Sequence, residues 1–423
     1  MAILKPFKGI RPKKELVQNI ACRPYDVLNE QEAREETKGD SNSFYHVIKP
    51  EIDFPDDFDH YSPEIYKKGK ENFERMFKEG VFSQDNKDYY YIYAQTMPAR
   101  LVPGATADRK QYGIVGCAAV DDYVNNIIKK HELTRPDKEE DRKNHVRISN
   151  LNYEPVFFAY PQVKALDVVV NKVTAGKAEY DFTSDDGIGH TFWIVNEDTD
   201  IQTITDEFAK LKYTYVADGH HRTAAAALVG KERREANPNH TGKEEYNYFL
   251  AVHFPDNQLQ IMDYNRVVKD LNGLSASEFI EKVKVDFAVE DKGGEEYRPS
   301  KLHELSMYLE GKWYKLTANA GTFNDSDPIG VLDVTILSEK VLAPLLNIVD
   351  LRKDKHIDFV GGLRGLGELK KRVDSGEMKA AFALYPVTMK QLINIADNDL
   401  IMPPKVTWFE PKLRSGLVLH SLD

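Results

Sequence analysis

The pattern of hydrophobic and polar residues divides the chain into many short segments, which predict a mixture of strands and helices. Alternating or continuous apolar runs predict strands, and apolar residues three or four positions apart predict helices. The predicted strands cover residues 43–48, 89–95, 111–120, 155–160, 166–170, 180–186, 190–195, 213–216, 248–254, 258–262 and 378–385. The predicted helices cover residues 13–20, 29–37, 63–78, 203–211, 224–235, 277–283, 333–346 and 390–396, and another helix starts at Asp121.

The order of these elements indicates the fold class. Strands and helices follow one another irregularly rather than as a doubly wound series, so we expect an α+β fold with mixed sheets. The chain has 423 residues, enough for two cores. Because the pattern becomes looser near residue 270, we expect an α+β domain over residues 1–270 and a smaller C-terminal α+β region over residues 271–423. A proline-rich segment closes that region.

Composition narrows the class of protein. Charged residues make up 30% of the chain and hydrophobic residues 41%, which is typical of a globular protein. The net charge of −11 does not favour nucleic-acid binding. Two cysteines are too few for a disulfide framework. With no signal-peptide-like or membrane-spanning apolar run, we expect a cytoplasmic protein without a membrane segment, and we leave assembly into a homo-oligomer open.

The strand predicted at residues 213–216 leads through Asp218 and Gly219 into the helix predicted from Ala224. The first turn of a helix offers unpaired N–H groups to an anion. Gly219 lets a ligand approach the backbone, and Arg222 can grip an anion with two parallel bonds. Asp218 can cap the helix, hold a histidine tautomer or bind Mg²⁺. The alternative is a plain cap beside a solvated turn, but four polar groups at one turn, which also include His220 and His221, favour a phosphate site.

Further polar residues are candidates for the same site. Pro24 stiffens the loop that carries Arg23, Tyr25 and Asp26, although a simple turn before the next helix fits equally well. His131 and Glu132 stand at the end of an element, where side chains can point into a cleft, whereas the charge run after them is typical of a solvated helix face. Additional candidates are Arg142 on the following helix, Arg266 after residues 258–262, and Lys405 and Lys412 in the closing segment, which is otherwise a structural strap.

Four ordered segments of the chain resemble the signature segments of the DUF1015 family, which span nearly the whole sequence. They are Arg23-Pro-Tyr-Asp-Val27, His131-Glu-x-Thr134 with Asp141-Arg142, Asp218-Gly-His-His-Arg222, and Met402-Pro-Pro-Lys-x-Thr with Phe409-x-Pro-Lys412. The third segment also resembles the phosphate-binding motif of the ParB/sulfiredoxin-like fold, whose members include ParB, sulfiredoxin and free-serine kinases. The resemblance implies a ParB/sulfiredoxin-like core and a phosphate-binding turn over residues 218–222. Sulfiredoxin has a cysteine in this motif and this chain has none there.

These features lead us to expect a phosphotransferase that acts on a small polar metabolite, with free serine or phosphoserine the best guess from the resemblance. The donor would be ATP, ADP in the reverse direction, or pyrophosphate, with Mg²⁺ bound by Asp218. The predicted catalytic residues are Asp218 and, as general base, Asp26 or Glu132. The predicted phosphate ligands are Gly219, His220, His221 and Arg222, and the predicted substrate ligands are Arg23, Tyr25, His131, Arg142, Arg266 and Lys405.

Two alternatives come from other classes of protein. A nucleotide-binding regulatory protein would bind the same phosphorylated ligand without turning it over. A ParB-like nucleic-acid-associated protein would need a basic stripe or a helix-turn-helix module, and the sequence contains only short basic clusters. We therefore expect a small-molecule ligand and not a nucleic acid.

Overall fold

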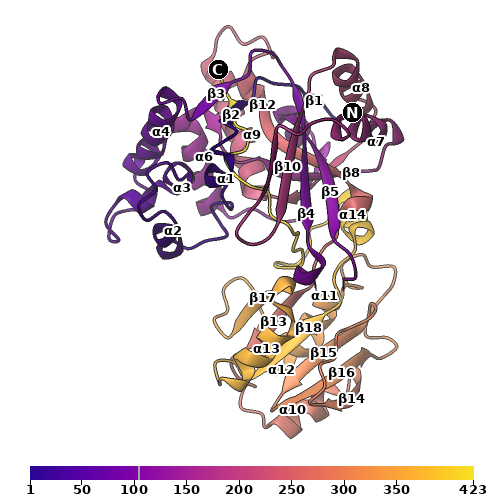
Figure 1. The fold of residues 1–423 in the computed structure, drawn as a ribbon. Coiled ribbons are helices and arrows are strands. Elements are labelled where there is room, and N and C mark those ends of the chain that lie inside the picture. The colour runs from indigo at the N-terminus through magenta and orange to yellow at the C-terminus, as the bar shows by residue number, and fades with distance from the viewer. Residues whose placement is uncertain (103–104) are drawn as a thin grey trace. The chain divides into compact units, whose positions relative to one another are not determined.

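The computed structural model describes residues 1–102 and 105–423, which form two compact units (Figure 1). Unit 1 comprises residues 1–99, 106–259 and 411–423, and unit 2 comprises residues 100–102, 105 and 260–410. The expected boundary at residue 270 stays a prediction; in this division the main segment of unit 2 begins at Gln260, and the last residues of the chain return to unit 1. There, Ser415 bridges to Cys22 and Leu419 bridges to Ile10 as isolated antiparallel pairs.

Unit 1 is built on a nine-stranded sheet in the order β6-β11-β8-β12-β5-β4-β10-β9, with β1 paired to β5. The pairs β12–β8 and β11–β6 are parallel and the others are antiparallel, which confirms the predicted α+β class with mixed sheets. The strands are β1 (Leu4–Lys5), β4 (Tyr90–Met97), β5 (Arg109–Ala119), β6 (Ile128–Lys129), β8 (Val156–Tyr160), β9 (Tyr180–Thr183), β10 (Gly189–Val195), β11 (Thr214–Asp218) and β12 (Tyr248–Pro255).

Helices cover this sheet through two apolar clusters. One cluster joins α7 and α8 to strands β4 and β10, and the other joins α9 to strands β8 and β12. The small side chains of Ala226 and Ala227 let α9 pack closely against Val156 and Phe158. The helices are α1 (Val17–Ile20), α2 (Glu30–Glu36), α3 (Tyr45–Ile48), α4 (Pro63–Lys78), α5 (Val120–Val124), α6 (Pro136–Ser149), α7 (Lys164–Thr174), α8 (Asp198–Phe208) and α9 (His220–Ala236), and the remaining strands of unit 1 are β2 (Ile10–Pro12), β3 (Phe82–Gln84), β7 (Leu151–Asn152) and β19 (His420–Ser421).

Three strand predictions are wrong. Residues 43–48 contain helix α3, and residues 166–170 lie within helix α7. In α7 the buried side chains are Leu166, Val169 and Val170, a helical spacing that the valine run conceals. Residues 258–262 form no strand, since β12 ends at Pro255 and Ile261 makes only an isolated bridge to Phe409.

Unit 2 is a six-stranded antiparallel sheet in the order β14-β16-β15-β18-β13-β17. Helix α13 packs through Leu366 and Leu369 on Val267 and Tyr308 of the sheet. The strands are β13 (Tyr264–Val268), β14 (Phe287–Gly293), β15 (Glu304–Leu309), β16 (Lys312–Ala318), β17 (Ile357–Gly361) and β18 (Ala380–Leu384), and the helices are α10 (Ala276–Val283), α11 (Asp333–Leu337), α12 (Ala343–Leu346), α13 (Gly365–Asp374) and α14 (Met389–Asp397).

The predicted helix over residues 333–346 is formed by α11 and α12, joined by a π-helical turn over residues 338–342. The wider turn ends at Leu342, two residues before Pro344, which cannot donate a backbone hydrogen bond. Throughout the described part of the chain, none of the helices has the length and apolar character needed to span a membrane.

Candidate functional site

The turn between β11 and α9 forms as the sequence predicts. Gly219 joins the two elements with φ +93° and ψ 33°, in the left-handed region that favours glycine. Its carbonyl accepts hydrogen bonds from the backbone N–H and the hydroxyl of Thr223. Among the described residues no side chain caps the N-terminus of α9. The first N–H groups of a long helix therefore face the turn, an arrangement that favours a bound anion.

Asp218 is held on both of its carboxylate oxygens. Oδ1 accepts a hydrogen bond from the N–H of Gly219 over 2.9 Å, and Oδ2 accepts one from Nζ of Lys412 over 3.2 Å. Burial alone would raise the pKa of Asp218, but the charges of Lys412 and Arg222 lower it to about 2. Asp218 is therefore ionised at neutral pH, and this geometry favours it as the anchor of Lys412.

His220 and His131 form a buried pair of neutral imidazoles. Their rings meet edge to face with centroids 4.5 Å apart. Burial lowers the pKa of His220 to about 4 and that of His131 to about 3, so both are uncharged at neutral pH. Oε2 of Glu132 lies 3.8 Å from Nδ1 of His220. A phosphate would thus meet His220 as a polar group and not as a cation.

His221 lies near both candidate general bases, Glu132 and Asp26. Its Nε2 accepts a hydrogen bond from the N–H of Arg135 over 3.0 Å, which places the ring proton on Nδ1. Burial lowers the pKa of His221, while the charges of Glu132 and Asp26 oppose that shift. Asp26 is exposed and Glu132 is half-buried. The structure thus brings both carboxylates to the α9 end of the turn.

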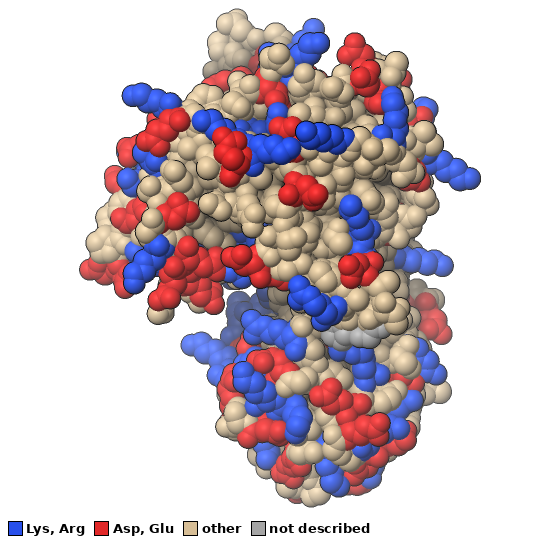
Figure 2. Space-filling model, viewed as in Figure 1, with Lys and Arg blue, Asp and Glu red and all other residues tan. Residues whose placement is uncertain are grey.

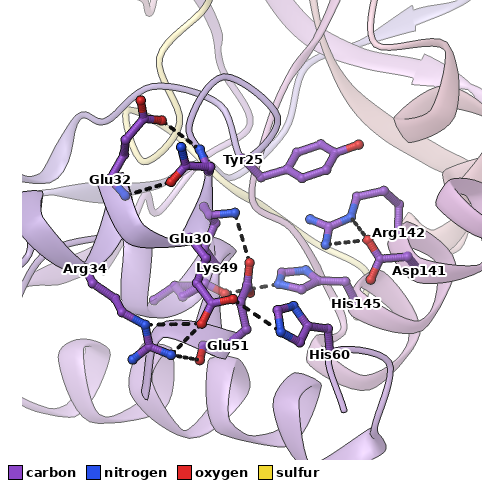
Figure 3. Close-up of polar contacts among 12 residues, drawn as sticks. Tyr25, Glu30, Glu32, Arg34, Lys49, Glu51, His60, Asp141, Arg142 and His145 are labelled. Atoms are coloured by element: carbon purple, nitrogen blue, oxygen red, sulfur yellow. Dashed lines mark hydrogen bonds and ion pairs between the residues drawn. The ribbon is translucent and has the colours of Figure 1, made fainter. Parts of the chain in front are cut away.

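Two arginines supply positive charge beside the turn. Nη1 of Arg222 donates to the carbonyl of Pro155 over 2.7 Å. Arg142, on α6, is 7% exposed and donates twice to Oδ2 of Asp141, over 3.1 and 2.9 Å. Figure 3 shows the Arg142 guanidinium beside the ring of Tyr25, whose centroid lies 3.9 Å from the guanidinium carbon. This stacking fixes the guanidinium plane.

A cavity of about 30 Å³ separates the two guanidinium groups from the sheet. Its polar lining includes Arg142, Arg222 and Glu154, and its apolar lining includes Tyr153 and Phe249. Among the described residues Nη1 of Arg142 has no hydrogen-bond partner, although Oε2 of Glu154 lies 3.9 Å away. The volume admits one or two water-sized groups. It is a small, mostly apolar recess that both guanidinium groups line.

The predicted site residues fall into three groups. Unit 1 brings together the turn, Tyr25, Asp26, His131, Glu132 and Arg142. Arg23, on the loop that also carries Tyr25 and Asp26, forms an ion pair with Glu36. Arg266 and Lys405 belong to unit 2, where Arg266 donates to the Lys405 carbonyl over 2.9 Å. The substrate-binding roles of these residues stay predictions.

Two further residues belong to the cluster. Lys412, which the sequence names as a candidate without a role, pairs with Asp218, and the segment Phe409-x-Pro-Lys412 is the sequence signal that points to it. Glu154 is the residue that sequence reasoning missed. Oε1 of Glu154 accepts hydrogen bonds from the N–H of Tyr25 and the hydroxyl of Ser415, both over 3.0 Å. No local sequence signal marks Glu154, because its partners come from distant parts of the chain.

Mg²⁺ does not fit Asp218 as its protein ligand. Both carboxylate oxygens already accept hydrogen bonds, and the Lys412 ammonium occupies the position in front of Oδ2. Within residues 1–102 and 105–423, no three His, Cys, Asp or Glu side chains form a metal-binding group. Mg²⁺ usually binds one or two carboxylates together with substrate phosphates and water. We therefore draw no step through a metal ion.

The family comparison matches most of the chain and covers three of its four signature segments, whereas the segment over residues 402–412 lies outside the match. The sequence model described as "Protein of unknown function (DUF1015)" matches residues 4–335. The chain belongs to the DUF1015 family. This match confirms the resemblance seen in the sequence, and it covers the turn, helix α6 and the Arg23–Asp26 loop of this DUF1015 protein. A comparison with curated proteins gives no match.

Several solved structures are similar to this DUF1015 chain at low identity. A conserved hypothetical protein from Pyrococcus furiosus has 16% identity and a TM-score of 0.35, covering 72% of this chain and 93% of its own. A free serine kinase variant in complex with AMP has 12% identity and a TM-score of 0.35, with coverages of 70% and 86%. SbnI from Staphylococcus aureus, truncated at its C-terminus, has 12% identity and a TM-score of 0.37, with coverages of 70% and 82%.

Proposed function

We propose that unit 1 binds the phosphates of a small ligand at the β11–α9 turn and transfers a phosphoryl group between that ligand and a small polar metabolite. The observation that carries the proposal is the pairing of an open helix N-terminus with two cations. Gly219 exposes the first N–H groups of α9, and Arg222 and Lys412 stand beside the same carboxylate, Asp218. Backbone N–H groups and cations aimed at one place suit phosphoryl transfer, which depends mainly on positioning and charge.

Arg222 and Lys412 bring two cations to the turn. The ammonium of Lys412 donates to Oδ2 of Asp218, and Nη1 of Arg222 donates to the carbonyl of Pro155. Asp218 would hold the Lys412 ammonium next to the helix N-terminus while its own charge is balanced. A phosphate at the turn would then receive hydrogen bonds from backbone and side chains together.

The attacking hydroxyl needs a base, and the site offers two carboxylates. Glu132 and Asp26 both lie near enough to His221 to influence its pKa. Either could take the proton from a hydroxyl held between the phosphate and the carboxylate. Arg142, held by Asp141 and Tyr25, would bind an anionic group of the acceptor with its remaining donors. Tyr25 and His131 would shape the pocket, and Arg23 remains a candidate for the acceptor as well.

The phosphate donor in this proposal is ATP, ADP or pyrophosphate, and the acceptor of first choice is free serine. That choice follows from the resemblance of residues 218–222 to the motif of free-serine kinases. In the reverse direction phosphoserine would be dephosphorylated by ADP. Mg²⁺ would accompany the phosphates of the donor and would not be held by Asp218.

The test is ³¹P NMR of the full chain with Mg²⁺ and each donor, with and without serine, and with phosphoserine plus ADP. Transfer gives a new phosphomonoester signal while the donor signal falls, and Asp218→Asn should slow it at least about a hundredfold. Ligand binding with no product in any mixture would instead support a nucleotide-binding regulator. If neither binding nor product is observed, both the phosphotransferase and the nucleotide-binding regulator are excluded.

A nucleic-acid role receives no support from the charges. On the face shown in Figure 2, acidic and basic side chains are interspersed over each unit. The net charge is −11. Non-specific nucleic-acid binding depends on neutralising several phosphates with a basic surface.

A further inference from the structure

Unit 2 contains a small cavity that the phosphate site does not use. The sheet strand β13 contributes Arg266 and Tyr264 to its wall, and the first turn of α11 contributes Asp333 and Val334. Its volume is about 10 Å³, which admits one water-sized particle. The cavity thus has a basic side chain on the sheet side and an acidic one on the helix side.

Arg266 is a buried cation that has no acidic partner among the residues the structure describes. It is 1% exposed and sits on a central strand, where it pairs in register with Phe359 and Phe382. Its Nη atoms donate to the backbone carbonyls of Tyr264 and Lys405. Among the described residues Nε has no hydrogen-bond partner, and no carboxylate forms an ion pair with the guanidinium. An unbalanced buried charge is costly, so this position needs an anion.

Asp333 is also buried, and in the described part of the chain only one of its two carboxyl oxygens has a hydrogen-bond partner. It is 3% exposed, and Oδ1 accepts a hydrogen bond from the N–H of His303 over 2.8 Å. Within the described chain Oδ2 has no partner. Burial raises the pKa of Asp333 to about 7, and the nearby charge of Glu304 adds to the shift. Near neutral pH the carboxyl is therefore ready to carry a proton on the oxygen that lacks a partner.

We propose that this cavity binds one small monovalent anion of chloride size between the guanidinium of Arg266 and the protonated carboxyl of Asp333. Both side chains then donate to the anion, through Nε–H and Oδ2–H. The anion balances the arginine charge, and the neutral carboxyl adds none. A phosphate or a sulfate is too large for a cavity of about 10 Å³.

The groups around Asp333 support this choice of ligand. Glu304 is 2% exposed and is an ionised carboxylate that already has a cationic partner, since it pairs with Lys315 over 2.8 Å and accepts from Tyr297 over 2.9 Å. His303 contributes only its backbone N–H to Asp333. Within the described chain, Arg266 is therefore the cation at this cavity without an ion-pair partner, and Oδ2 of Asp333 is the carboxyl oxygen without a donor.

Binding is then linked to a proton. An ionised Asp333 repels an anion and offers no donor, whereas a protonated one donates. Chloride affinity should fall as the pH rises through 7, by at most about tenfold per pH unit, because one proton is taken up with each anion. The phosphate site lies in unit 1, so this proposal stands or falls independently of the proposed function.

The experiment uses the full chain in sodium gluconate at constant ionic strength, titrated with sodium chloride or sodium bromide. Thermal unfolding at pH 6 should shift upward with either halide and not with sulfate, and the shift should shrink at pH 8. A crystal grown in bromide should show an anomalous bromine peak between Arg266 and Asp333. A peak elsewhere only, or a water molecule at this position in bromide, overturns the proposal.

Variants connect the effect to the two side chains. Arg266→Met should abolish the halide shift, while Arg352→Met, which removes an exposed arginine of the same unit, should keep it. Because Arg266→Met can fail to fold, Asp333→Asn provides a second test. Its amide donates at every pH, so the halide shift should persist and become nearly equal at pH 6 and pH 8, a range in which Arg266 stays mostly charged although burial lowers its pKa to about 9. A halide shift in Asp333→Asn that still depends on pH contradicts the assignment.

Discussion

Nζ of Lys412 donates a hydrogen bond to Oδ2 of Asp218 over 3.2 Å, although 194 residues separate the two in the sequence. The backbone of Lys412 is fixed as well, because its carbonyl accepts a hydrogen bond from the amide of Gln95 over 2.8 Å. Two residues later Arg414 pairs with Asp186. The closing segment of the chain thus supplies a cation to the turn and is held there from both sides.

Replacing this cation should weaken phosphate binding. Lys412→Ala removes a charge-assisted donor worth about 1.5–3 kcal/mol, so the affinity for pyrophosphate should fall about tenfold to a hundredfold in isothermal titration. Lys412→Arg should keep part of the affinity. The matched control is Lys210→Ala, which removes an exposed lysine paired with Glu207. Equal losses in the Lys412 and Lys210 variants would disprove the role of Lys412.

The left-handed backbone at Gly219 should be needed for binding and not only for folding. The backbone of Gly219 has φ +93°, and a Cβ added to this residue would lie 3.2 Å from Nε of Arg222. Gly219→Ala should therefore cost about 1–2 kcal/mol of stability and displace Arg222, with loss of pyrophosphate binding. Gly242 has φ +86° and open space around its Cβ. Gly242→Ala should cost similar stability and leave the binding constant unchanged.

The general base can be identified by isosteric amides. Glu132→Gln and Asp26→Asn each remove a proton acceptor while keeping side-chain size. The variant that lacks the general base should bind pyrophosphate with nearly wild-type affinity and should transfer phosphoryl groups about a hundredfold or more slowly than the wild type. Single-turnover ³¹P NMR separates the two effects. If both variants keep wild-type transfer rates, the base is another group.

Buried neutral histidines should make unit 1 sensitive to acid. Burial lowers the pKa of His253 to about 3, below the ordinary value near 6.5. The unfolded chain then binds a proton that the folded chain does not, so stability falls by about 1.4 kcal/mol per pH unit below pH 6.5. His253→Phe fits between the rings of Phe158 and Phe208. The variant should therefore lose less free energy of unfolding than the wild type between pH 8 and pH 5, as measured by urea unfolding.

The control for His253→Phe is His60→Gln, because the side chain of His60 is 46% exposed. That variant should leave the difference between pH 8 and pH 5 unchanged. An equal change in both variants would mean that burial of His253 is not the cause.

Local patterns predicted the parts of the fold that depend on neighbouring residues. Helix α4 has Pro63 at its start and runs to Lys78 as predicted, because its N-cap, its proline and its apolar face all lie within the segment. The turn at Gly219 was predictable for the same reason. The valine run in α7 was not, since β-branched residues favour strands until a helical face is buried by other elements.

The site was predictable only where its chemistry is local. Asp218, Gly219 and Arg222 lie within five residues and could be recognised together. Lys412 and Glu154 reach the site through tertiary contacts, with Glu154 joined to Ser415 by a hydrogen bond over 3.0 Å. No spacing in the sequence encodes such a contact. Burial, which makes His220 neutral, is likewise a property of the folded chain.

The most direct test of the phosphate site is the thermal shift of the full chain with Mg²⁺ and ADP, ATP or pyrophosphate, measured for the wild type and Asp218→Asn. A ligand present at a hundred times its Kd should stabilise the wild type by about 2.7 kcal/mol, a shift of several degrees. Asp218→Asn should lose most of that shift relative to its own ligand-free Tm, because Lys412 loses its anionic anchor. No shift of the wild type with any of these ligands would contradict the phosphate site and leave the β11–α9 turn a structural feature.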